Sequence, residues 1–275
     1  MSLDRLEALL QRFSMNTRLF HSGVLCGSID FGERDQCGYL HLVRRGPLEV
    51  RHRQERTIYI DQPTLLMYPR PMGHQFICDE LVGADLVCAS VEFAGGAINP
   101  IANALPSIVV TPLNELTMLS TTLELLFSEA STQQCGRQSV MNRLFEVVLI
   151  QLLRLAMQQG AVDNGMLAGL SHPQLQKALV AMHENPAREW TLEALGDTAG
   201  MSRSSFANTF RDSVGQTPGD YLMAFRVGVA QDLLKRGRPL KHVAADVGYG
   251  SPVALSRAFK ARTGMSPRDW LLSQA

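Results

Sequence analysis

Short segments with alternating apolar and polar positions fill the chain from residue 24 to about residue 95. Leu40 and Leu42, and likewise Leu48 and Val50, alternate with polar residues. Apolar residues at every second position are typical of a half-buried strand. Gly46-Pro47 separates these two pairs and is a turn signal. Several such strands at short spacing predict a small β-barrel or sandwich.

From about residue 113 the period becomes helical. Two stripes indicate two helices, broken by STQQCGRQ: Leu116, Leu119, Leu123 and Leu126, then Val140, Leu144, Val147, Gln151 and Leu155. A homodimer contact through this helical pair and packing of the pair on its own barrel both remain open. The Gly-rich, polar stretch that follows indicates a linker at 161–170.

The rest of the chain contains an internal repeat, in which 191–222 aligns with 239–271. Gly200 aligns with Gly248, Phe210 with Phe259 and Pro218 with Pro267. Each copy predicts a short helix, a glycine turn and a second helix, with Ser or Thr caps and Pro at first helical positions. One apolar-faced helix between the copies joins them. The pattern is that of two helix-turn-helix units.

The second helix of each copy places polar and basic residues opposite its apolar stripe. These outward residues are Arg203, Ser204, Ser205, Asn208, Thr209 and Arg211 in the first copy, and Ser256, Arg257, Lys260 and Arg262 in the second. Such side chains reach base edges and phosphates in a major groove. The repeat therefore predicts double-stranded DNA as a partner, whereas a plain helical repeat would not need this outward chemistry.

Charge and cysteine content agree with a cytoplasmic DNA-binding protein. Residues 171–275 hold 13 Lys and Arg against 9 Asp and Glu, and the remainder holds 13 against 17. No secretory signal or membrane-length apolar run is visible. No cysteine pair has CxxC spacing, and all five cysteines precede the repeat: Cys26, Cys37, Cys78, Cys88 and Cys135.

Residues 171–275 resemble the DNA-binding domain of the AraC-type regulators, and the block GYGSPVALSRAFKARTGMSPRDWL matches the family's second-unit signature. The resemblance implies RNA polymerase as a further partner. It places base-facing positions at Ser204, Ala207 and Asn208, and at Pro252, Val253, Ser256 and Arg257. Ala207, Pro252 and Val253 cannot donate side-chain hydrogen bonds, so reading there is contact with thymine methyls, reading of shape, or absent.

The strand-rich part resembles cupin-like effector domains through YLHLVRRG, TLLMYPRPMGHQF and DLVCASVEF. In metal-binding cupins, histidines at the two ends of this span are ligands, and the corresponding residues here are His41 and His74. Because a zinc site usually has four ligands and only these two correspond, a barrel that holds an organic ligand or none is favoured. Some members of this branch sense oxidants, including reactive chlorine species, through cysteines at the places of Cys26 and Cys88.

The expected fold is α+β: a cupin-like effector domain with a helical pair over 1–160, the linker at 161–170, and an all-α DNA-binding domain over 171–275. The expected function is a DNA-binding transcription regulator that responds to a small effector or oxidant, with no cofactor. The alternatives are a DNA-binding adaptor with an inert dimerisation domain and a cupin enzyme fused to a DNA-binding module. No catalytic fingerprint supports an enzyme.

Overall fold

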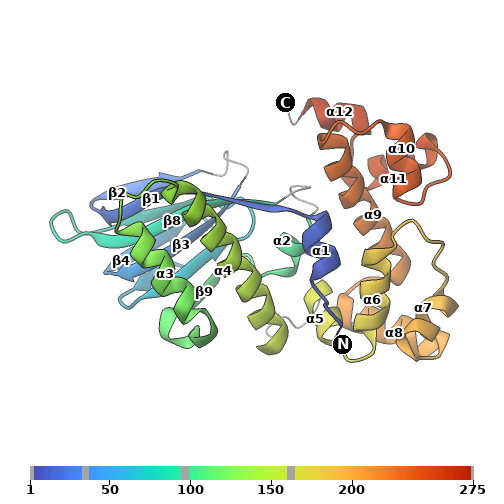
Figure 1. Ribbon diagram of the computed structural model, residues 1–275, viewed down its shortest axis with the longest axis horizontal. Helices are drawn as coiled ribbons and strands as arrows, with labels where there is room; N and C mark the ends of the chain where they lie inside the picture. The colour runs from blue at the N-terminus through green and yellow to red at the C-terminus, as the bar shows by residue number, and fades with distance from the viewer. Residues whose placement is uncertain (1–2, 33–36, 94–98, 160–164, 274–275) are drawn as a thin grey trace. The chain divides into compact units, whose positions relative to one another are not determined.

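The computed structural model describes residues 3–32, 37–93, 99–159 and 165–273 (Figure 1). The chain forms two compact units. The barrel unit comprises 15–96 and 105–155, and the helical unit comprises 1–14, 97–104 and 156–275. A strand-rich first part and an all-helical last part confirm the expected α+β class.

The barrel unit consists of two antiparallel sheets. One has the strand order β1-β8-β3-β6-β9 and the other β2-β7-β4-β5. The strands are β1 (Met15–Leu25), β2 (Ser28–Phe31), β3 (Gly38–Arg45), β4 (Leu48–His52), β5 (Ile58–Ile60), β6 (Thr64–Tyr68), β7 (His74–Ile77), β8 (Ala84–Phe93) and β9 (Val109–Pro112). Large buried side chains between the sheets include Phe31, Tyr39, Tyr68 and Phe76. The predicted turn at Gly46-Pro47 joins β3 to β4.

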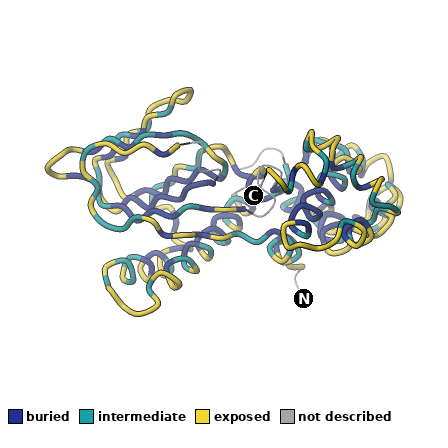
Figure 2. The backbone as a smooth tube through the Cα atoms, turned by 90° about the horizontal axis from the view of Figure 1, so that it is seen from above, coloured by how far each residue is buried: buried dark blue, intermediate teal, exposed yellow. Residues whose placement is uncertain are grey.

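Strand β3 is buried on both faces, so the expectation of a half-buried strand was wrong there. All six residues from Gly38 to Val43 are buried (Figure 2). The reason is a second cover: helices α3 (Ser120–Ala130) and α4 (Arg137–Gln159) lie along the outer face of the five-stranded sheet (Figure 1). A strand at the centre of a sheet covered on both faces loses the alternation of its exposure.

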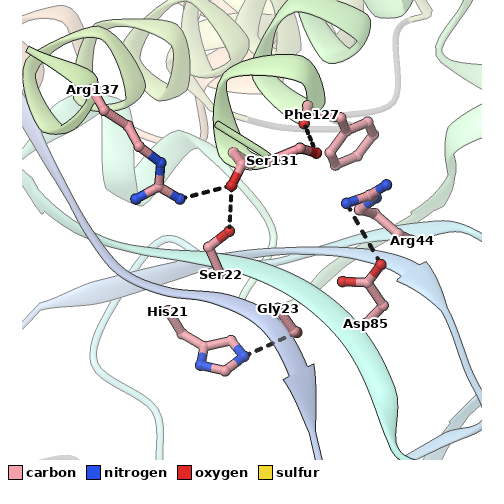
Figure 3. A network of polar contacts seen from close by, with 9 residues as sticks. His21, Ser22, Gly23, Arg44, Asp85, Phe127, Ser131 and Arg137 are labelled. Atoms are coloured by element: carbon pink, nitrogen blue, oxygen red, sulfur yellow. Dashed lines mark hydrogen bonds and ion pairs between the residues drawn. The ribbon is translucent and has the colours of Figure 1, made fainter. Parts of the chain in front are cut away.

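Polar contacts fasten the two helices to the sheet. Ser22 of β1 and Arg137 of α4 both donate to the carbonyl of Ala130, at 3.3 and 2.9 Å, where α3 ends (Figure 3). Arg44 pairs with Asp85 at 3.5 Å, and its guanidinium lies 5.2 Å from the ring centroid of Phe127 on α3. The helical pair therefore packs on its own barrel.

The buried face of α4 differs from the predicted one. Val140 and Val147 are exposed, whereas the buried stripe is one residue further along: Met141, Phe145, Val148 and Leu152. One residue rotates a helix by about 100°, so the two stripes lie on different faces. The stripe with Met and Phe buries more apolar area than one of valines, leucines and a glutamine, and this stripe faces the sheet. The four leucines predicted for the first helix, Leu116, Leu119, Leu123 and Leu126, are all buried, but Leu116 lies between and Leu119 within the 3-10 turns that precede α3.

The helical unit contains the N-terminus of the chain as well as its C-terminal part. Helix α1 (Glu7–Arg12) lies against α6 (Leu175–Glu184), and Arg12 donates to the carbonyls of His183 and Glu184, each at 2.7 Å. Phe13 is fully buried with its ring edge-on to Phe225, at 5.3 Å between centroids. The compact unit that holds the C-terminal helices thus also includes residues 1–14, whereas the effector domain was predicted to cover all of 1–160.

The second half of the predicted linker is helical. Helix α5 (Met166–Ser171) buries Met166, Leu167 and Leu170. These apolar residues make it part of the helical unit, which the glycines and polar residues around them concealed in the sequence. Residues 160–164 lie outside the described residues. Helix α2 (Pro100–Ala104) also belongs to this unit and contacts α5.

Candidate DNA-binding surface

Local chemistry shapes the first helix-turn-helix unit, α7 (Leu192–Ala199) and α8 (Arg203–Val214), as predicted. Thr191 accepts the N–H of Ala194 at 3.1 Å, and Ser202 accepts the N–H of Ser205 at 3.3 Å. Gly200 ends α7 in the left-handed region at φ +68°. Gly196 was not predicted to matter for this turn, yet an added Cβ there would lie 2.9 Å from the Met201 carbonyl oxygen. The turn is that tight because α8 folds back over α7.

The second unit repeats this construction with α10 (Leu240–Asp246), α11 (Pro252–Thr263) and α12 (Pro267–Leu272). Ser251 accepts the N–H of Ala254 at 3.1 Å, and Ser266 accepts the N–H of Asp269 at 3.2 Å. Gly264 ends α11 at φ +77°. The joining helix is α9 (Pro218–Lys235), capped by Thr217 with Pro218 in its first turn.

Arg226 of α9 is a positioning residue that the sequence analysis missed. Its guanidinium donates to the carbonyls of Pro186 and Arg188, at 2.7 and 2.9 Å, in the loop after α6. The same group lies 5.7 Å from the ring centroid of Tyr249, in the turn of the second unit. One side chain of the joining helix thereby connects the loop before the first unit to the turn of the second.

The predicted base- and phosphate-contacting residues lie on the outer faces of α8 and α11. The inward residues Phe206, Phe210, Leu255 and Phe259 are fully buried. Opposite them, Ser256 and Thr209 are half-buried, and seven of the predicted contact residues are exposed: Arg203, Ser204, Ser205, Asn208, Arg211, Arg257 and Lys260. None of the four cations in this set forms an ion pair among the described residues. Their charges are free to meet phosphates.

A buried polar pair lies beneath this surface. The Nε2 of His183 on α6 and the hydroxyl of Tyr221 on α9 are 2.5 Å apart. Burial lowers the pKa of His183 to about 3, so the imidazole is neutral near pH 7. Tyr221 also stacks edge-on against Phe210 of α8, at 5.6 Å between centroids. The pair links the helix that precedes the first unit to the joining helix.

The two predicted sensor cysteines differ in environment. Cys26 is exposed, just after β1, whereas Cys88 is fully buried within β8 and burial raises the pKa of its thiol. Cys88 is the register partner of His21 on β1 and of His41 on β3. Cys78 is held beside the segment that follows Cys26, because its backbone N–H donates to the Gly27 carbonyl at 2.8 Å.

The structure brings His41 and His74 together inside the barrel, with their Nε2 atoms 3.2 Å apart. The Nδ1 of His74 lies 2.9 Å from the Met72 carbonyl, so this nitrogen carries the proton and Nε2 accepts. His41 then donates from Nε2, and its buried Nδ1 has no hydrogen-bond partner among the residues that the structure describes. Burial lowers the pKa of both rings, that of His74 to about 4.

Two imidazoles alone do not make a zinc site, which takes four ligands. Among the described residues, no group of three His, Cys, Asp or Glu side chains could hold a metal ion. Aromatic rings surround the pair instead: Tyr68 stacks on His74 at 4.0 Å and Phe31 does so at 4.6 Å. Within the described part of the chain, the surroundings of His41 and His74 do not fit a metal centre. No described helix is both long and apolar enough to cross a membrane.

Comparison with known proteins finds matches over both parts of the chain. The family model Cupin matches residues 4–158, and the model Helix-turn-helix domain matches residues 195–273. A putative AraC-like transcription regulator of Streptomyces lividans is 34% identical over 189 residues, 67% of this chain and 62% of the relative. This chain thus spans less than two thirds of that relative's length.

Two further matches are a named transcriptional activator and a DNA-binding domain solved with its target DNA. The RCS-specific transcriptional activator RclR of Escherichia coli K12 is 25% identical over 210 residues, covering 75% of this chain and 74% of RclR. The crystal structure of the AdpA DNA-binding domain in complex with target DNA is 31% identical, covers 37% of this chain and 93% of that one, and has a TM-score of 0.36. The chain thus belongs to the Cupin family over residues 4–158, carries a helix-turn-helix domain behind it, and is similar to AraC-like transcription regulators.

Proposed function

We propose that this protein regulates transcription by reading a specific DNA sequence with α8 and α11, and that its barrel unit receives the signal. The observation that supports the DNA part is the pair of outward faces, each polar and basic over a fully buried apolar stripe. Helix α9 has 18 residues and is about 27 Å long. It carries one reading helix near each end, a span close to the roughly 34 Å between successive major grooves.

Within this surface, the residues have two roles. Ser204, Asn208, Ser256 and Arg257 lie toward the first two turns of their helices, the part that contacts base edges in helix-turn-helix proteins. Arg203, Ser205, Arg211 and Lys260 contact the backbone on either side, which fixes the register of the protein on the duplex.

The distinction is tested with Arg257→Ala and Lys260→Ala. Loss of a base contact costs about 1–3 kcal/mol on a selected duplex and relaxes the preference at that position, whereas loss of a phosphate contact weakens binding to all duplexes. We expect the first result for Arg257 and the second for Lys260. Equal losses for Arg257→Ala on the selected and a random duplex would show that Arg257 contacts only the backbone.

For the signal, the accessible thiol supports a response to oxidants that begins at Cys26. The thiolate is the reactive form, and it requires exposure to solvent. Cys88 lacks that exposure, and the raised pKa keeps it a thiol. Cys26→Ser should therefore abolish any change in DNA affinity caused by hypochlorous acid, and Cys88→Ser should not. If both variants respond like the parent protein, the signal enters elsewhere.

A further inference from the structure

Helix α11 carries one exposed feature that hydrogen bonding to DNA does not explain. Val253, its second residue, is 61% exposed and is the only large apolar side chain so exposed on either reading helix. The outer face of α8 has only small or polar side chains there. Pro252, beside it, is half-buried. An isolated apolar side chain on a surface is ordinary, but this one lies on the face that meets base edges.

We infer that Val253 reads the 5-methyl group of a thymine, so that the second helix-turn-helix unit recognises thymine by apolar contact. The inference rests on the proposed DNA-reading function. Among the four bases only thymine presents a methyl group in the major groove, and apolar side chains recognise it by direct contact. The side chain of Val253 has no polar atom, so burial of its methyls against that group is the recognition it can provide.

The neighbours of Val253 show where this thymine lies. Arg257 is four residues further along and thus one turn away on the same face, about 6 Å along the helix axis. Base pairs are stacked about 3.4 Å apart along the duplex. Arg257 suits the O6 and N7 of guanine. The recognised thymine is therefore within about two base pairs of the guanine that Arg257 contacts.

An exposed valine also suits contact with a protein partner. The positive charges beside Val253 favour DNA instead. Arg257 and Lys260 lie on the same side of α11, and neither forms an ion pair among the described residues. A surface that combines one apolar contact with an arginine suited to guanine and a lysine suited to phosphate complements the major groove of DNA.

Deoxyuridine tests the inference, because it pairs as thymine does and lacks only the methyl group. The full-length protein first selects its duplex from a random pool. Each thymine is then replaced singly by deoxyuridine, and Kd is measured by fluorescence anisotropy for the parent protein and for Val253→Ala. The variant should fold, since alanine favours helix more than valine does and the side chain is mostly exposed.

We expect one thymine, near the Arg257 guanine, at which deoxyuridine raises Kd about fourfold for the parent, the effect of one buried methyl. Val253→Ala should bind the thymine and deoxyuridine duplexes equally at that position and keep the parent's response elsewhere. Leu272→Ala is the matched control: it removes a side chain that is 68% exposed on α12 and should leave the parent's pattern unchanged. At the same position, 5-methylcytosine should bind more tightly than cytosine, and only when Val253 is present.

Two results overturn the inference. In one, Val253→Ala weakens the thymine and deoxyuridine duplexes equally at every position, which means that the side chain supports the helix or a protein partner. In the other, the parent protein shows no deoxyuridine-sensitive position near the Arg257 guanine. Failure of the proposed function looks different, because then no duplex is enriched in the selection at all.

Discussion

Truncation of Phe13 to alanine tests how firmly the N-terminal segment belongs to the helical unit. The Phe13 side chain is fully buried, edge-on to Phe225, and its ring lies over Gly228, where an added Cβ would be 3.0 Å from it. Removal of a buried phenyl ring costs about 3–5 kcal/mol when the site cannot collapse. We expect a value near the lower end, about 3 kcal/mol, because α1 has only six residues and can shift toward α9.

The two tryptophans make this loss measurable for the helical unit alone. Trp190 and Trp270 are the only tryptophans of the chain, and both lie in that unit. Their fluorescence in urea therefore follows its unfolding without a contribution from the barrel unit. With an m-value of about 2 kcal/mol/M, Phe13→Ala should lower the urea midpoint by about 1.5 M.

Leu3→Ala is the matched control for this experiment. Leu3 belongs to the same N-terminal segment, but its side chain is 46% exposed, and truncation should move the midpoint by no more than about 0.25 M. An unchanged tryptophan midpoint in Phe13→Ala would refute the packing of the N-terminal segment on α9. A loss of similar size in both variants would show that the segment acts through the unfolded chain and not through the Phe13 contact.

Three further results should follow from the same structure. Ser251→Ala removes the cap of α11 and should cost about 1 kcal/mol in urea unfolding, whereas Ser256→Ala, in the middle of the helix, should cost less; equal losses would contradict the capping role. Iodoacetamide should alkylate Cys26 in the folded protein and Cys88 only after denaturation, as peptide mass spectrometry can show; early labelling of Cys88 would mean that the barrel opens. Burial disfavours the charged form of His183 and so lowers its pKa to about 3 in the folded protein. The free energy of unfolding should therefore be highest above about pH 6.5 and decrease as the pH falls toward 3, with a loss of about 2 kcal/mol by pH 5. His183→Gln cannot take up the proton, and its tryptophan-detected midpoint should fall less between pH 7 and 5 than that of the parent; parallel curves would assign the loss to other groups.

The helix-turn-helix units could be predicted from the sequence because local rules determine them. Thr191, Ser202 and Ser251 cap helices within three residues of their own positions, and Gly200 and Gly264 end helices in conformations that favour glycine. Because the sequence repeats, caps and helix-ending glycines occur in both copies. What the sequence did not reveal was Arg226, since its partners lie about 40 residues away and an exposed-looking arginine carries no mark of its contacts.

The barrel unit and the N-terminal segment were harder to predict because distant contacts determine them. The Arg12 guanidinium meets a carbonyl 171 residues away, and no periodicity within α1 indicates that partner. Helix α4 has two apolar stripes that are one residue apart, and packing against the sheet determines which of them is buried. The pair His41 and His74 came from a family resemblance; the structure adds that aromatic rings stack on His74 and that no third metal ligand joins the pair among the described residues.

The two helix-turn-helix units have the same arrangement of helices and caps but expose different side chains. We therefore expect them to read different DNA sequences. Arg226 connects the loop before the first unit to the turn of the second, so both reading helices are held on one frame. Helix α8 presents Ser204 and Asn208, whose side chains can both donate and accept hydrogen bonds, whereas α11 presents Val253 beside Arg257. A serine–asparagine pair and a valine–arginine pair favour different base edges. We therefore expect one chain to bind two unlike groove segments, so that the internal repeat of the protein does not imply a repeated DNA sequence.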